Sequence, residues 1–216
     1  MLRPLKITFD LDGSGIYYDP NEPIMIDGLL QYALAPYHTT GDPPTRDEEP
    51  DEIPLPLGRW QIDGVWGWHA SALFPQEKQF EGMQFWRKKF RQNRAELIPG
   101  TVNIQSGIYR DYNMPLPLLL TSQMTGWALG DRKRVHQALR RHVKYLGKKR
   151  AYGKGVVQNI TVEWCDEDYS LTKDGIATRF LPQLNSTRIF RPRPPYWNRW
   201  GAIACCEIGE MYDQHG

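Results

Sequence analysis

The most constraining stretch of the sequence runs from residue 131 to residue 164, because it specifies a helix, a glycine-rich loop and a strand in succession. Asp131 is a good N-cap for a first helical turn, and Gly147 can adopt the left-handed conformation that ends a helix. Between them, apolar residues recur at helical spacing on one face: Val135, Leu139, Val143 and Leu146. The pattern predicts a helix over 132–146.

The same stretch carries most of the excess positive charge. Residues 131–154 hold ten basic residues and one acidic residue, a local balance of 10 − 1 = +9, whereas the whole chain carries a net charge of +2. Cations crowded on one helix face repel one another, so helix stability does not explain their placement. We therefore expect an anionic partner for this region.

The loop after the helix does not have the spacing of an ATP-binding P-loop. Gly153 follows Gly147 one residue too late, and Gly155 stands where a magnesium-binding hydroxyl is needed. The order of helix and strand is also reversed. Exposed amides and a tyrosine suit a nucleic-acid backbone better. We predict these RNA-binding residues: Arg140, Arg141, Lys144, Lys148, Lys149, Arg150, Tyr152, Gly153, Lys154 and Gly155.

The rest of the chain indicates an α+β protein forming a single domain over residues 1–216, with 40% hydrophobic residues, enough for a core. Alternation predicts strands at 5–11 and 156–164, short strands within 57–74 and another at 101–112. A helix is expected over 26–35, capped by Asp27 and stopped by Pro36. Residues 39–56 hold five prolines and an acidic cluster, which predicts an exposed loop.

Basic and aromatic residues also alternate at 86–94, and arginines accumulate near the C-terminus, from Arg188 to Arg199. Such runs suit phosphates and unstacked bases, although the 86–94 run fits an ordinary solvated face equally well. Trp60, Trp66 and Trp68 are typical of core and sheet packing.

No apolar window approaches the length of a membrane span, and the N-terminus does not resemble a signal peptide. The three cysteines form no C-x-x-C pair, so neither a disulfide framework nor a zinc site is predicted. We expect a cytoplasmic protein without membrane contact, metal or cofactor.

Two catalytic interpretations compete with binding. Asp10-Leu-Asp-Gly-Ser14 resembles the nucleophile motif of haloacid dehalogenase-type phosphatases, but Lys6 and Thr8 give its strand a polar face that a central parallel strand lacks. His69, His136 and His142 could act as general acid or base in metal-independent RNA cleavage. None of the three histidines has a recognisable partner nearby in sequence.

Leu146-Gly-Lys-Lys-Arg-Ala-Tyr-Gly-Lys-Gly-Val156, after its helix, resembles the glycine-rich loop of the RAMP superfamily of CRISPR-Cas RNA-binding proteins. Three further segments are similar to the Cas-five-like subunit of type IV CRISPR effector complexes: Ile26-Asp-Gly-Leu-Leu-Gln-Tyr-Ala33, Trp68-His-Ala-Ser-Ala-Leu73 and Arg191-Pro-Arg-Pro-Pro-Tyr-Trp197. The resemblance implies a ferredoxin-like, RRM-like fold with an elaborated middle region.

The resemblance also implies a function. The chain would be a non-catalytic structural subunit that caps the 5′ handle of a CRISPR RNA (crRNA) and contacts the backbone subunits and the large subunit. Through the assembled complex it would meet target DNA. The RAMP endoribonuclease that processes precursor crRNA shares the loop and is the main alternative.

Overall fold

A computed structural model describes residues 1–38, 45, 48–90, 103, 110–148 and 150–212. Its central element is a four-stranded sheet in the order β5-β8-β1-β9, in which every neighbouring pair is antiparallel. The four strands are β1 (Arg3–Leu11), β5 (Phe74–Pro75), β8 (Gln123–Gly130) and β9 (Val157–Trp164). The strands predicted at 5–11 and 156–164 are confirmed as β1 and β9.

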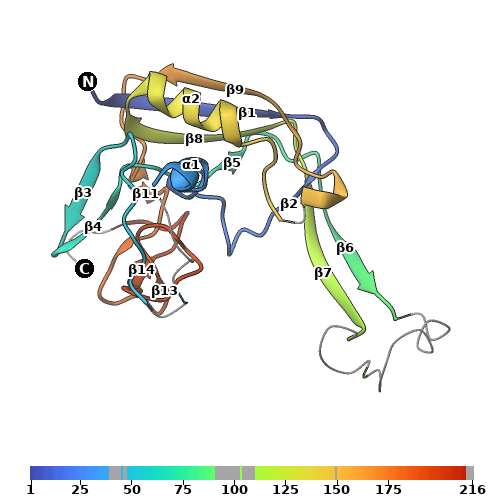
Figure 1. The fold of residues 1–216 in the computed structure, drawn as a ribbon. Coiled ribbons are helices and arrows are strands. Elements are labelled where there is room, and N and C mark those ends of the chain that lie inside the picture. The colour runs from blue at the N-terminus through green and yellow to red at the C-terminus, as the bar shows by residue number, and fades with distance from the viewer. Residues whose placement is uncertain (39–44, 46–47, 91–102, 104–109, 149, 213–216) are drawn as a thin grey trace.

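Two helices, α1 (Ile26–Leu34) and α2 (Arg132–His142), cover one face of this sheet (Figure 1). The alternating apolar residues of β1 point toward them, because Leu5, Ile7 and Phe9 have no exposed surface and belong to the same core as Leu30 and Leu139. The polar residues of β1 lie on the opposite face, as a period of two requires.

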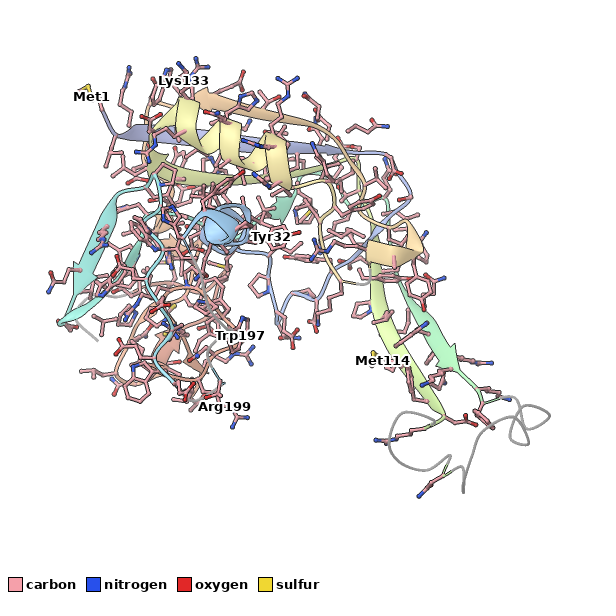
Figure 2. The ribbon with its side chains drawn as sticks, in the orientation of Figure 1. Met1, Tyr32, Met114, Lys133, Trp197 and Arg199 are labelled. Atoms are coloured by element: carbon pink, nitrogen blue, oxygen red, sulfur yellow. The ribbon has the colours of Figure 1, made fainter. Side chains whose placement is uncertain are left out.

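Five further strands lie between β1 and β8 in the described chain. β3 (Arg59–Ile62) and β4 (Val65–Trp68) form a hairpin, as the alternation within 57–74 predicted. A three-stranded sheet in the order β2-β7-β6 joins β2 (Ile16–Tyr17) to the long hairpin of β6 (Phe80–Lys88) and β7 (Tyr112–Leu120), which projects from the body in Figure 1. Met114 lies on this projecting arm in Figure 2.

The C-terminal part consists of short strands. β10 (Thr172–Lys173) pairs with β11 (Ile176–Ala177), and β14 (Ile203–Cys206) lies between β12 (Leu181–Pro182) and β13 (Ile189–Phe190). The three cysteines are free thiols. No helix in the described ranges is long and apolar enough to cross a membrane.

The helix predicted over 132–146 ends earlier than the apolar spacing suggested. Asp131 caps α2 as predicted, but Val143 is extended and the helix stops at His142. Lys144 and Leu146 instead make backbone hydrogen bonds with the chain entering β9. This pairing still buries both remaining apolar residues of the stripe, since Val143 is 3% and Leu146 1% exposed. Tertiary pairing therefore prevails over helical periodicity.

Asp27 does not cap α1, so the capping role predicted for it is wrong. The N-cap position is Met25, and the Asp27 carboxylate is completely buried. Its oxygens accept hydrogen bonds from the Tyr196 hydroxyl at 2.7 and 2.8 Å and from the buried Arg179 guanidinium at 3.3 Å. Burial raises the pKa of the Asp27 carboxyl, and the Arg179 charge opposes that rise. The carboxylate thus joins α1 to the C-terminal part.

The exposed loop predicted at 39–56 is only partly exposed. Residues 39–44 and 46–47 lie outside the described residues. The end of the segment is buried, with Ile53 at 6% and Leu55 at 7% exposure in the main core. Apolar residues that alternate with prolines reach the core here without a helix or strand. Proline content therefore predicts the lack of secondary structure in this segment but not its exposure to solvent. Residues 101, 102 and 104–109 of the strand predicted at 101–112 lie outside the described residues; of the others only Tyr112 is in a strand, as the first residue of β7.

Candidate nucleic-acid interface

The glycine-rich loop is closed at its base by backbone pairing. Tyr145 and Val156 form an isolated β-bridge, and the Leu146 N–H donates to the Gly155 carbonyl at 2.8 Å. One turn of 3-10 helix, η4 (Arg150–Tyr152), forms the loop's tip. Backbone hydrogen bonds therefore fix the two chain segments at the base of the loop, from which its side chains project.

Glycine is required at defined points of this loop. Gly147, Gly153 and Gly155 all have positive φ angles, of 80°, 69° and 69°. A β-carbon on Gly155 would clash with the Leu146 carbonyl oxygen, and one on Gly147 would lie 2.6 Å from the Tyr17 carbonyl oxygen. Close backbone approach thus explains two of the three glycines.

The turn that follows β1 makes hydrogen bonds to the glycine-rich loop. The Asp12 carboxylate accepts hydrogen bonds from the Ser14 N–H and hydroxyl, which lowers the pKa of this carboxyl. The Ser14 hydroxyl also lies 3.1 Å from the Gly153 carbonyl, and the Lys154 ammonium donates to the Ser14 carbonyl at 2.6 Å. The Asp-Leu-Asp-Gly-Ser motif therefore holds the glycine-rich loop in place.

A cavity of about 280 Å³ opens between the loop and α1. Tyr18, Tyr32 and Tyr145 contribute aromatic surface, and Lys148 and Arg150 line the loop side. Tyr32 belongs to α1, and Figure 2 shows it on the side of that helix toward β2. The Arg150 guanidinium lies 5.0 Å from the Tyr32 ring centre and donates to its hydroxyl at 3.2 Å. Lys148 forms an ion pair with Glu22 across the cavity rim.

The projecting hairpin meets the other side of the loop. The Tyr152 ring is 5.9 Å from the Trp86 ring, which in turn packs edge-on against Tyr112 at 4.6 Å. The Arg87 guanidinium donates to the Asn113 side chain at 3.2 Å in the same hairpin. The basic and aromatic start of the 86–94 run is thereby joined to the glycine-rich loop, while residues 91–94 lie outside the described residues.

The other predicted cations fall into a separate group. Arg140, Arg141 and Lys144 are exposed at and just beyond the end of α2. Arg141 lies 5.9 Å from the Tyr37 ring, and together with Arg134 and His142 it lines a second cavity of about 170 Å³. Lys149 lies outside the described residues. The nine predicted residues that the structure describes therefore do not converge on one point but follow the surface from α2 into the loop.

Sequence reasoning missed the aromatic wall of the larger cavity. Tyr18 and Tyr32 come from segments more than 100 residues before the loop, so no local pattern links them to it. Tyr145 does adjoin the basic run, and a tyrosine among lysines was the available signal.

Each candidate catalytic histidine has its own partner. His69 Nδ1 lies 3.2 Å from Asp168 and 2.9 Å from the Ser170 hydroxyl, so both contacts use one ring nitrogen. His136 contacts the Ile160 carbonyl at 3.2 Å, and His142 the Tyr37 hydroxyl at 3.0 Å. A nucleophile–histidine–carboxylate relay needs its two partners on opposite ring nitrogens, which His69 lacks.

The motif that resembles a phosphatase nucleophile sits in an antiparallel sheet. Asp10 accepts hydrogen bonds from the side chains of Gln123 at 2.8 Å and Asn159 at 3.1 Å, on the two strands flanking β1. Both neighbours run antiparallel to β1, whereas the phosphatase interpretation needs a central parallel strand. Within the described ranges, no group of three or more histidine, cysteine or acidic residues could hold a metal ion.

The site thus combines a cationic loop with a tyrosine-lined cavity in an α+β protein. The exposed amides expected of the loop are not all free, because the N–H groups of Lys148, Gly153 and Gly155 donate to backbone carbonyls. The model of the family described as CRISPR type IV associated protein Csf3 matches residues 3–98 and 84–206. The chain therefore belongs to this type IV CRISPR-associated family. No curated protein matches the chain.

Proposed function

We propose that the chain is a non-catalytic, crRNA-binding subunit of a type IV CRISPR effector complex that caps the 5′ handle of the guide RNA. One observation carries the proposal: the tyrosine-lined cavity opens beside the glycine-rich loop, with Lys148 and Arg150 on its rim. Cations there would contact phosphates, while the rings would stack on bases that single-stranded RNA leaves unpaired.

The order of elements supports the RAMP assignment. Along the chain β1, α1, β5, β8, α2 and β9 follow one another, and in space the strands lie in the order β5-β8-β1-β9. This order supports a ferredoxin-like fold, which has the arrangement βαββαβ, and β3, β4, β6 and β7 would be its elaborated middle region. In such a fold the loop that connects α2 to β9 would correspond to the RAMP glycine-rich loop.

The partners follow from the family. A type IV CRISPR-associated chain assembles with other CRISPR subunits, and we propose the backbone subunits, the large subunit and crRNA as the contacts. Target DNA would reach the chain only through that assembly.

The test coexpresses the full chain with its genomic neighbours, purifies the complex and sequences the small RNA that copurifies. In the wild type we expect a single RNA class with a uniform 5′ end. Lys148→Glu/Lys149→Glu/Arg150→Glu should lose that RNA with little change in Tm, since exposed charges contribute about 0–1 kcal/mol each to folding.

A matched control changes as many exposed cations outside residues 131–154: Lys6→Glu/Lys78→Glu/Lys173→Glu. This variant has the same net charge, so it should keep the RNA if the loop is the site. Equal RNA recovery from both variants would place the RNA elsewhere.

A further inference from the structure

A second cationic surface lies away from the glycine-rich loop. The Arg59 guanidinium lies 4.5 Å from the Trp66 ring centre and 4.9 Å from that of Trp68, and the Arg193 guanidinium lies 4.3 Å from Trp66. We call these four residues the Arg–Trp cluster. In Figure 1 its strands, β3 and β4, lie on the opposite side of α1 from β2, against which the loop packs.

An acidic segment covers the Arg–Trp cluster. Residues 48–52, Glu-Glu-Pro-Asp-Glu, form what we call the acidic strap. Glu52 makes an ion pair with Arg59, and burial lowers the pKa of Arg193 while the charges of Glu49 and Glu52 oppose that shift. Strap and cluster together line a polar cavity of about 130 Å³. The strap therefore supplies the negative charge that these arginines meet in the free chain.

Contacts away from the Arg–Trp cluster fix the path of the strap, and one of them uses a strap carboxylate, since Glu48 accepts a hydrogen bond from the Thr45 N–H at 2.9 Å. The Asn198 side-chain amide donates to the carbonyls of Thr45 at 3.2 Å and Glu48 at 2.8 Å, and is itself held by Arg191 at 3.0 Å. At the other end Ile53 is buried in the core.

The charge pairing is also weak. The side chains of Arg59 and Glu52 are 50% and 47% exposed, and ion pairs of that kind contribute little to stability. The strap carboxylates can leave the arginines without unfolding the segment.

We propose that the Arg–Trp cluster is a second binding site, for the phosphodiester backbone of single-stranded nucleic acid, and that the acidic strap occupies it until such a strand displaces the carboxylates. A guanidinium stacked on tryptophan keeps its N–H edge available for phosphate oxygens. A row of carboxylates imitates a phosphate chain, so strap and strand compete for the same groups. The chain belongs to a CRISPR-associated family, which favours a nucleic-acid strand over an acidic protein as occupant.

This proposal does not depend on the glycine-rich loop. The test therefore uses the full chain with Lys148→Glu/Arg150→Glu as background, so that binding at the loop does not mask the second site. The probes are fluorescein-labelled 20-mers of oligothymidylate and oligouridylate, with affinity followed by anisotropy at low salt.

Neutralising the strap with Glu49→Gln/Asp51→Asn/Glu52→Gln should tighten binding about tenfold, as expected when about two more phosphates become neutralised. Adding Arg59→Gln/Arg193→Gln should remove the gain. Glu77→Gln/Glu163→Gln/Asp166→Asn changes the net charge equally on other exposed surfaces and should give no such gain. Equal gains for the two probes identify backbone recognition, and unequal gains identify which strand the site prefers.

A labelled polyglutamate peptide serves as a third probe. Three results would overturn the proposal: strap and control variants that bind the oligonucleotides with equal affinity, a gain in affinity that survives loss of both arginines, or a gain in affinity only for the peptide. Thermal unfolding of each variant shows whether it is folded. If the triple variant does not fold, Glu49→Gln alone removes one exposed carboxylate and should give a smaller gain in the same direction.

Discussion

At the scale of single residues, alanine substitutions at two glycines of the loop distinguish the cost of a left-handed backbone conformation from the cost of a steric clash. Gly153 and Gly155 share a φ of 69°, but a β-carbon on Gly153 meets nothing within 4 Å, whereas one on Gly155 meets the Leu146 carbonyl. Gly153→Ala should lower the free energy of unfolding by about 1 kcal/mol, from the left-handed conformation alone. Gly155→Ala should lower it by about 2–4 kcal/mol, because the backbone must also move.

Urea unfolding at neutral pH measures both values, and copurified RNA gives a second readout. We expect Gly155→Ala to lose more of the RNA than Gly153→Ala, because only the former displaces the loop backbone. Equal destabilisation by the two substitutions would mean that the Gly155–Leu146 approach does not constrain the loop.

Individual residue types could be predicted from sequence where a local rule applied. The N-cap role of Asp131 follows from sequence, since it depends on its neighbours in the chain. Gly147 has the positive φ expected of it, but its predicted role in ending the helix was wrong, because α2 ends at His142 and Gly147 lies against the Tyr17 carbonyl instead. The burial of Asp27 could not be predicted, because its partners Arg179 and Tyr196 lie more than 150 residues away.

At the scale of elements, α2 offers a test of capping and pH together. The Arg134 N–H donates to the Asp131 carboxylate at 3.0 Å, and hydrogen bonding to that N–H lowers the pKa of this carboxyl from 3.8. A lowered folded pKa means that the charged cap stabilises the fold above pH 3.8, and that this contribution is lost as pH falls through the folded pKa.

Asp131→Ala should therefore lower the urea midpoint at pH 7 and make less difference in strong acid. Asp131→Asn keeps a capping oxygen without a titrating group, so its advantage over the alanine variant should not change with pH. Urea midpoints of the three proteins at pH 7 and pH 2.5 measure both effects. A wild-type advantage over alanine that is unchanged at pH 2.5 would show that the carboxylate charge does not contribute.

β1 and β9 could be predicted because their apolar residues alternate regularly and no tertiary contact overrides that pattern. The projecting hairpin of β6 and β7 escaped prediction because its strands do not bury one regular face: Phe80, Met83 and Phe85 are each more than 50% exposed. Alternation signals half-burial, and a strand without it gives no signal.

At the scale of the whole molecule, the candidate site draws on the turn after β1, the segment after β2, α1, the β6–β7 hairpin and the glycine-rich loop. The cations of this site were visible in sequence because they cluster along the chain. Its tyrosines were not, because they come from the segment after β2, from α1 and from the chain after α2, which meet only in the folded protein. Charge patterns along the sequence thus located the cations of the site, whereas its rings depend on the tertiary fold.

We expect the folded chain to bind RNA without cleaving it. Cleavage needs an acid and a base fixed beside the scissile phosphate, whereas His69, His136 and His142 are each engaged by a different partner. A labelled repeat RNA incubated with excess protein in EDTA should stay intact. Its log affinity should fall with log salt by about 0.7 for each phosphate neutralised.

The same incubation with His69→Ala and His142→Ala distinguishes binding from the RAMP endoribonuclease. A single specific cut by the wild type that either substitution abolishes would establish the nuclease. Scattered fragments that persist in both variants would indicate a contaminating nuclease, because a cut made by this chain must depend on the group that moves the proton. Intact RNA in all three proteins, together with the salt slope, is the result that a capping subunit requires, because a subunit that holds one end of a guide must leave that end uncut.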